Sequence, residues 1–178
     1  MYIFYKGTIF AALFFCFIPS AFAADTTTQM GAGYGFDVRS SANLEQYEIF
    51  LRAPLPYETK FFGLEVGTAA EFGFGYIKDW NTNDSGAARF SIMPEIVLAP
   101  HDQFSFILGL GAGFMTGNTD FAGHDLGGPL LFALKIGMQY HINRHWGIED
   151  AFYHQSNGDI YSHNYSLNMN QLTLAYTF

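Results

Sequence analysis

The chain has 178 residues, of which 49% are hydrophobic, 19% aromatic and only 13% charged, and acidic residues outnumber basic ones 16 to 8. The aromatic content excludes disorder, and the formal charge of −8 makes the chain a poor non-specific ligand for nucleic acid. A polytopic helical membrane protein is excluded as well, because after residue 24 no apolar run reaches the roughly 18 residues that a spanning helix needs.

Residues 1–23 are predicted to be a secretory signal peptide. A weakly positive start precedes an apolar stretch over residues 9–18, and residues 21–23 (Ala-Phe-Ala) fit the small-x-small pattern of a cleavage site. An uncleaved anchor is the alternative, but the apolar stretch is short for one. The single cysteine, Cys16, lies in this segment. The mature chain, residues 24–178, is therefore expected to lack disulfides, cysteine nucleophiles and thiolate metal sites.

From residue 28 onward, large apolar residues alternate with small or polar ones at a period of two, which is the spacing of β-strands. In residues 104–114, for example, Phe, Leu and Ala occupy the even positions and Ser, Ile and Gly the odd ones. Many of the predicted strands reach the roughly 9–11 residues that a tilted strand needs to cross a bilayer. The eight predicted strands cover residues 28–38, 44–53, 61–78, 88–98, 103–116, 128–141, 146–156 and 168–178.

The charged residues of these strands decide between a soluble sandwich and a membrane barrel. They lie opposite the large apolar side chains, on a face rich in glycine, and the apolar face is too continuous for a soluble sandwich. A closed barrel places that apolar face on lipid and the charges in a narrow lumen, and it leaves no sheet edge unpaired. Asp150 is the exception, because it shares the apolar parity. The charges on the lumen parity are Asp37, Glu48, Arg52, Glu65, Glu71, Arg89, Glu95, Lys135 and Glu149.

The connections agree with a bacterial outer-membrane location. The predicted segments 54–60, 99–102 and 142–145 are short, whereas the connections after the third, fifth and seventh strands are longer and polar. Short turns on one side and long loops on the other are typical of outer-membrane barrels, and an even strand count places both termini in the periplasm. The last strand is amphipathic and ends at Phe178, which resembles the signal read by outer-membrane assembly machinery. The predicted fold is an all-β, eight-stranded antiparallel outer-membrane β-barrel.

Five of the six histidines are interpreted as solvated or interfacial residues. His101, His141 and His145 fall at the short turns, and His124 and His163 fall in long loops. No H-E-x-x-H motif, Cys/His cluster or glycine-rich phosphate loop occurs, so no metal site is predicted.

His154 differs from the other histidines because it lies at the outer end of the seventh strand, in the sequence His154-Gln155-Ser156-Asn157. His154 and Ser156 are two residues apart and share a face, which by parity with Trp146 points toward lipid. A polar pair facing lipid is costly and therefore a hint of function. The alternative is a polar strand end that simply enters a loop.

The last third of the chain, roughly residues 128–178, resembles the outer-membrane lipid A 3-O-deacylase (PagL-like) family. That family is an eight-stranded barrel with a His-x-Ser-Asn motif late in the sequence. The resemblance implies that Ser156 is the nucleophile and His154 its general base. It also implies that Asn157, with nearby backbone N–H groups, stabilises the oxyanion.

The third member of the family's triad is an acid twelve residues after the serine, where this chain has Asn168. An amide cannot offset the charge of an imidazolium, but it can accept an N–H bond and hold the ring's tautomer, as in Cys-His-Asn enzymes. Asn168 is the first choice for this role. Asp159 in the following loop and the misplaced Asp150 are substitute acids.

The activity implied by the resemblance is hydrolysis of an ester-linked acyl chain of lipid A in the outer leaflet, and a serine esterase needs no cofactor. The acyl position, any latency and a homodimer are left open. The main rival is a non-catalytic outer-membrane barrel whose extracellular loops bind surfaces or partners. A porin is disfavoured because eight strands leave a filled interior, and a soluble lipocalin-like carrier would need a hollow apolar lumen.

Overall fold

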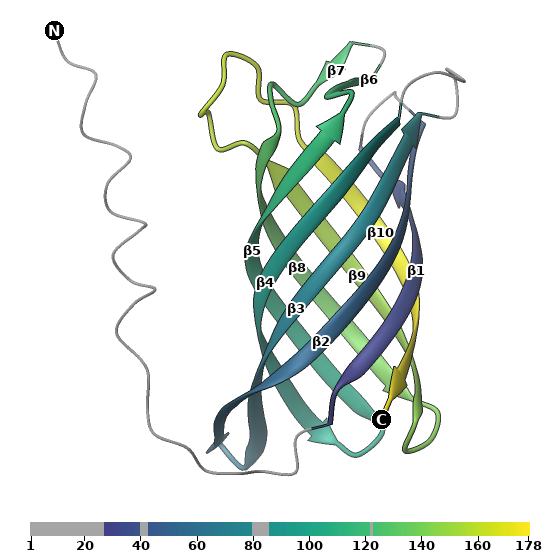
Figure 1. Ribbon diagram of the computed structural model, residues 1–178. Helices are drawn as coiled ribbons and strands as arrows, with labels where there is room; N and C mark the ends of the chain where they lie inside the picture. The colour runs from purple at the N-terminus through teal and green to yellow at the C-terminus, as the bar shows by residue number, and fades with distance from the viewer. Residues whose placement is uncertain (1–26, 40–42, 80–85, 122) are drawn as a thin grey trace, which may run out of the picture.

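The computed structural model describes residues 27–39, 43–79, 86–121 and 123–178, so the predicted signal peptide lies outside the described residues. Eight antiparallel strands of the described residues close into a barrel, in the order β1-β10-β9-β8-β5-β4-β3-β2 (Figure 1), and this confirms the predicted fold class. Over the same part of the chain, no helix has the length and apolarity needed to cross a membrane. The strands are β1 (Gln29–Asp37), β2 (Leu44–Phe61), β3 (Leu64–Asp79), β4 (Gly86–His101), β5 (Phe104–Gly117), β6 (Asp120–Phe121), β7 (His124–Asp125), β8 (Leu130–His141), β9 (Trp146–Ser156) and β10 (Leu167–Thr177).

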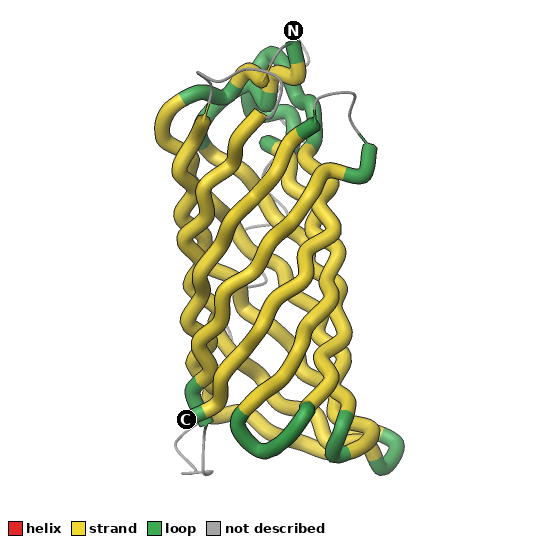
Figure 2. Tube along the Cα trace, turned by 90° about the vertical axis from the view of Figure 1, so that its right-hand side faces the viewer, coloured by secondary structure: helices red, strands yellow, loops and turns green. Residues whose placement is uncertain are grey.

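The barrel wall consists of strongly tilted strands, and the connections gather at its two ends (Figure 2). The C-terminus and the short turns lie at one end of the barrel, and the β6–β7 ribbon and the β9–β10 loop lie at the other (Figure 1). In an outer-membrane barrel the end that carries the termini and short turns faces the periplasm. The β9–β10 loop therefore belongs to the extracellular end.

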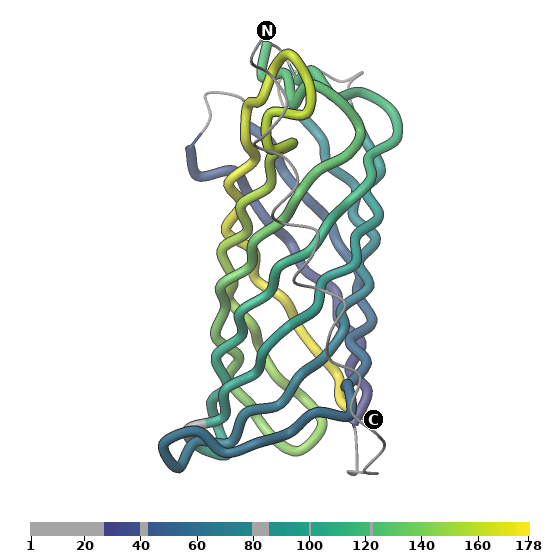
Figure 3. The backbone as a smooth tube through the Cα atoms, turned by 90° about the vertical axis from the view of Figure 1, so that its left-hand side faces the viewer, coloured from purple at the N-terminus to yellow at the C-terminus, as the bar shows by residue number. Residues whose placement is uncertain are grey.

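The largest difference from the predicted strand boundaries is in β2, which continues through residues 54–60 instead of turning there. Pro54 and Pro56 favoured a turn because proline lacks the N–H group that a strand ladder uses. However, β1 begins at Gln29, opposite Arg52, so beyond that point β2 pairs only with β3. Proline is tolerated on such an edge. The result is a long β2–β3 hairpin that splays outward from the barrel wall (Figure 3).

A second difference is the short ribbon β6–β7, which forms within the predicted loop after the fifth strand. Its strands have only two residues each, so the period-two pattern that identified the long strands has no room to show.

Side chains of the long strands alternate between the outer surface and the lumen. On β5, Phe106, Leu108 and Leu110 are 48%, 44% and 53% exposed, whereas the intervening Ile107 is buried. In a soluble protein with an apolar core, these large apolar side chains would be buried instead of exposed. The outer surface is thus apolar on every long strand, as a lipid-facing wall must be.

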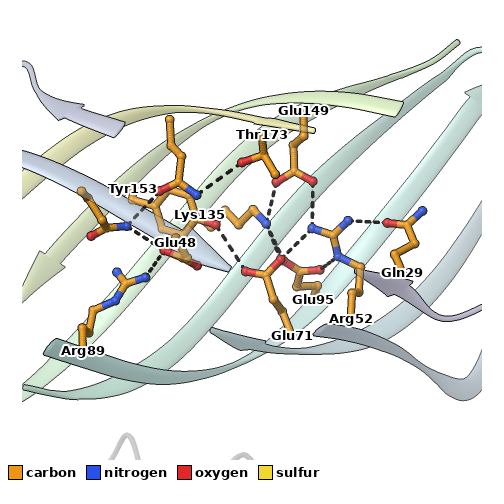
Figure 4. Close-up of polar contacts among 12 residues, drawn as sticks. Gln29, Glu48, Arg52, Glu71, Arg89, Glu95, Lys135, Glu149, Tyr153 and Thr173 are labelled. Atoms are coloured by element: carbon orange, nitrogen blue, oxygen red, sulfur yellow. Dashed lines mark hydrogen bonds and ion pairs between the residues drawn. The ribbon is translucent and has the colours of Figure 1, made fainter. Parts of the chain in front are cut away.

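The lumen is filled by charged side chains that contact one another (Figure 4). The Arg52 guanidinium lies 2.7 Å from Glu71, 2.6 Å from Glu95 and 2.8 Å from Glu149. The Lys135 ammonium contacts the same three carboxylates at 2.7–2.9 Å. All five side chains are buried. The predicted lumen of mixed charges is therefore confirmed for this group.

Nearer the extracellular end, Arg89 forms an ion pair with Glu48 and donates a hydrogen bond to Gln155 at 2.5 Å. Two of the nine predicted lumen charges keep the predicted face but are not enclosed as the others are. Asp37, at the end of β1, pairs with the buried Met169 and is half-buried. Glu65 is exposed and lies 3.6 Å from Lys60, because both are on the splayed hairpin, where no lumen remains to enclose them.

Candidate active site

The β9–β10 hairpin positions the histidine and the amide of the predicted site. His154 on β9 is directly opposite Asn168 on β10, and β9 ends two residues later at Ser156. On the other side of β9, His154 pairs with Leu134 and Ser156 pairs with Phe132 of β8. His154 and Asn168 thus lie side by side at the extracellular end of the wall, and Ser156 follows two residues along β9.

His154 and Ser156 have the parity of the lipid-facing side chains. Trp146 and Ile148, earlier on β9, are 42% and 39% exposed on the outer surface, and the alternation continues to His154 and Ser156, which are half-buried. Phe132, beside Ser156, is 48% exposed on the same side. Two residues on one strand face lie roughly 7 Å apart at the backbone, a gap that an imidazole can lean across to a hydroxyl.

A hydrogen bond joins His154 to Asn168. The ring Nδ1 lies 2.9 Å from the Asn168 side-chain oxygen. The amide nitrogen of Asn168 donates instead to Ser166, 3.1 Å from its hydroxyl and 3.4 Å from its carbonyl oxygen. Since the amide oxygen can only accept, Nδ1 carries the proton and Nε2 is left to accept one. This is the tautomer that a general base next to a serine needs.

Asn168 is nearly closed to solvent although its parity is that of the outer face. Only 3% of it is exposed, whereas Leu172, four residues along the same face, is 59% exposed. A buried amide whose oxygen and nitrogen both have partners is held in one orientation. The ring of His154 is therefore held by a rigid partner.

The two substitute acids do not occupy the place of Asn168. Asp159 has a positive φ of 63° and accepts a hydrogen bond from Asn164 at 2.8 Å within the β9–β10 loop. Asp150 is exposed on the outer face of β9, four residues from His154, which is about 13 Å along a strand. Asn168 is the member of the three that contacts the imidazole.

The side chain of Asn157 is not on the face that His154 and Ser156 share. It is fully buried, and its amide nitrogen donates to the carbonyl oxygens of Leu126 at 2.7 Å and His163 at 2.5 Å. Its backbone N–H donates to Asn164 at 3.1 Å. The Asn157 amide nitrogen is therefore engaged by two backbone carbonyls, and the side chain joins two loops.

Sequence reasoning missed the set of contacts that joins the β9–β10 loop to the segment between β5 and β8. His163 Nδ1 lies 3.1 Å from a carboxylate oxygen of Asp125, and the Tyr165 N–H donates to the Asp125 carbonyl at 3.2 Å. Gly127 has a φ of +80°, and a Cβ there would lie 1.9 Å from the His163 carbonyl oxygen. Contacts between distant loops follow no periodic pattern, so little in the sequence indicated them. The one hint was Gly127, two residues after Asp125.

The four remaining histidines have separate partners, and His101 Nδ1 accepts a hydrogen bond from the Gln103 N–H at 3.2 Å. His141 Nε2 lies 2.9 Å from the Ser105 hydroxyl at the periplasmic end, His145 contacts the Thr177 carbonyl, and His124 contacts the Ser166 carbonyl. Among the residues that the structure describes, no three His, Cys, Asp or Glu side chains form a group that could hold a metal ion.

The fold and the site define a small outer-membrane barrel with a His-x-Ser-Asn motif at the extracellular rim of its lipid-facing wall. Residues 45–177 match the model of the lipid A 3-O-deacylase (PagL) family. This match spans most of the chain, so the chain belongs to that family. No curated protein sequence gives a significant match. Membership of this family, together with the barrel fold, places the protein in the bacterial outer membrane and confirms the predicted location.

Solved structures agree with the fold. A crystal structure of the outer membrane enzyme PagL has a TM-score of 0.70 and 16% sequence identity, over 83% of this chain and 97% of that one. The protein Ail of Yersinia pestis has a TM-score of 0.53 and 15% identity, over 86% of this chain and 99% of its own. A de novo designed transmembrane β-barrel has a TM-score of 0.52 and 11% identity, covering 85% and 95%. At these identities the likeness establishes the fold alone.

Proposed function

We propose that the protein is a lipid A acyl-ester hydrolase, of the 3-O-deacylase type, that acts in the outer leaflet of the outer membrane. The observation that carries the proposal is the 2.9 Å contact between His154 Nδ1 and the Asn168 side-chain oxygen. His154 lies two residues before Ser156 on the outer face of β9. Family membership supports lipid A as the substrate.

In the proposed reaction, the Ser156 oxygen attacks the carbonyl carbon of the ester while His154 Nε2 takes the hydroxyl proton. The tetrahedral intermediate collapses, and the sugar oxygen departs with that proton, which leaves an acyl group on Ser156. Water then attacks the acyl-enzyme as His154 takes one of its protons. The fatty acid leaves, and the proton returns to Ser156.

Asn168 is proposed as a positioning residue that keeps the proton on Nδ1. The Asn157 amide is engaged by two backbone carbonyls, and its backbone N–H donates to Asn164, so oxyanion stabilisation is assigned to backbone N–H groups of the turn beyond Asn157. That turn is sharp, with positive φ values at both Gly158 and Asp159. The proposed role of Asn157 is to hold the turn in place.

The location of the site suits a lipid substrate. A molecule in the outer leaflet already lies beside the wall, and its ester bonds are near the membrane surface, at the depth where β9 ends. Ser156 and His154 face that lipid, so the substrate need not enter the charged lumen. The mechanism requires no cofactor. A homodimer stays a prediction.

The test is to incubate refolded protein with lipid A and to measure the acyl content of the product by mass spectrometry. We expect the loss of one acyl chain, and Ser156→Ala should lower the rate about a thousandfold or more. Ser162→Ala is the matched control, because this serine is in the adjoining loop and its hydroxyl contacts only His163 among the described residues. An active Ser156→Ala variant would end the assignment of the nucleophile. A native protein that leaves several forms of lipid A intact would favour the rival barrel with binding loops.

A further inference from the structure

The β2–β3 hairpin, residues 54–69, extends the sheet at the periplasmic end, where its β3 half still pairs with β4 but β2 no longer has β1 as a neighbour. β2 runs nine residues beyond Arg52, the last residue that pairs with β1, and it turns back at Phe62 and Gly63. These two residues have φ values of +50° and +81°. The hairpin splays outward from the barrel wall (Figure 3), so it is not a simple extension of the cylinder.

The hairpin has one apolar and one charged face. Phe61 pairs with Leu64 and Thr59 pairs with Val66, and partners in an antiparallel ladder share a face. Phe61 and Leu64 are 61% and 36% exposed. The opposite face carries the pair Lys60 and Glu65, whose charged groups lie 3.6 Å apart and whose side chains are 73% and 72% exposed.

The apolar face is continuous with the lipid-facing wall. Leu51 and Phe72 pair with each other on the outer surface of the barrel, and Leu55 continues their column. The register shift between Leu55 and Glu58 adds two residues to β2, so the parity is kept and Phe61 stays on the outer side.

The outward splay changes what each face meets. Where a barrel wall bends outward below the membrane, its outer surface turns up toward the bilayer and its inner surface turns toward the periplasm. The apolar face of the hairpin is then directed at the inner leaflet, and the charged face at water. At the tip, Phe62 is 90% exposed, and its ring packs edge-on against Phe61 with centroids 4.5 Å apart.

We propose that the hairpin 54–69 lies in the interfacial region of the inner leaflet, with Phe61, Phe62 and Leu64 inserted among phospholipid headgroups and upper acyl chains. Aromatic side chains are enriched at this depth of outer-membrane barrels. An amphipathic element with an apolar face and a charged face lies flat in such an interface. Phospholipid is the occupant because the apolar face continues a surface that already contacts lipid.

The test measures membrane depth with nitroxide labels in the full chain carrying Cys16→Ser, which removes its single cysteine. Phe61→Cys labels the apolar face and Lys60→Cys is the matched control on the charged face. The protein is placed in vesicles of phosphatidylethanolamine and phosphatidylglycerol, and power saturation compares collisions with oxygen and with a water-soluble nickel chelate. Ile49→Cys, on the lipid-facing wall, and Arg144→Cys, in another periplasmic turn, calibrate the two extremes.

We expect the oxygen-to-nickel ratio at position 61 to approach that at position 49 and to exceed that at position 60 several-fold. Because Phe61→Cys removes one of the apolar side chains, Leu64→Cys repeats the measurement with Phe61 intact. Heat-modifiable electrophoretic migration confirms that each variant is folded. Ratios at 61 and 64 equal to that at 144 would overturn the proposal. Dipolar broadening between labels of two chains would also overturn it, because the hairpin would then contact a second copy.

Discussion

In the proposed reaction His154 becomes positively charged during ester hydrolysis, and Asn168 would be its neutral partner. The Asn168 oxygen holds the proton on Nδ1 of His154, but an amide offsets much less of the imidazolium charge than a carboxylate does. In return, an amide that is only 3% exposed beside lipid avoids the large cost of burying a second charge. We therefore expect a slower enzyme than one with an acid at this position.

Asn168→Asp should raise kcat by about tenfold, because a carboxylate of the same shape keeps the hydrogen bond to Nδ1 and adds charge stabilisation. Asn168→Leu should lower kcat about a hundredfold with little change in KM, because the ring loses its tautomer and orientation but the lipid contacts remain. The measurement is deacylation kinetics on vesicles that contain lipid A. A merely structural role for Asn168 predicts equal losses in both variants, which is the result that would contradict this assignment.

At the scale of elements, the proposed site adjoins two extracellular segments that contact each other. The Asn157 amide bridges Leu126 and His163, and Gly127 lies so close to the His163 carbonyl that only a glycine fits. Because Asn157 directly follows Ser156, these contacts fix the turn that continues from the proposed nucleophile. We therefore expect the β9–β10 loop to support the proposed site.

Gly127→Ala should separate the two segments, and Gly123→Ala is its matched control. Both glycines have positive φ, +80° and +90°, so both substitutions strain the backbone by about 1 kcal/mol. Only at Gly127 would the new Cβ meet another segment, whereas at Gly123 nothing lies within 4 Å. We expect Gly127→Ala to increase protease cleavage in the loop 157–166 and to lower the deacylation rate about tenfold or more. Similar behaviour of the two variants would show that the loops do not depend on this contact.

The sequence predicted the long strands and one contact of the site, for reasons that can be named. Alternation over residues 146–156 predicted that His154 and Ser156 share the outer face, and the family resemblance made Asn168 the first choice for the contact with His154, which the structure forms. The position of the Asn157 amide could not be predicted, because it depends on Leu126 and His163, which are remote in sequence and follow no period. The continuation of β2 was missed because proline reads as a turn unless the missing neighbour strand is known.

At the scale of the whole molecule, the barrel reverses the usual arrangement, with an apolar exterior and a charged interior. In the lumen, the carboxylates of Glu71, Glu95 and Glu149 form ion pairs with Arg52 and Lys135, so three negative charges face two positive ones. The strands that supply them are spread around the barrel, so the cluster joins β2, β3, β4, β8 and β9 across the lumen (Figure 4). Its effect on stability should therefore depend strongly on which charge is removed.

Lys135→Met should destabilise the barrel by about 3–5 kcal/mol, because it leaves three buried carboxylates with one cation. Glu95→Gln should cost less, since the remaining two carboxylates balance Arg52 and Lys135. In the double variant, the loss of the Glu95 charge relieves repulsion that Lys135→Met creates, so the double variant should be more stable than the sum of the single losses predicts. Urea unfolding of the refolded protein in phospholipid vesicles measures all three values. If the two single losses simply add in the double variant, the charges act independently. That result would contradict a coupling between the Lys135 ammonium and Glu95, which lie 2.9 Å apart.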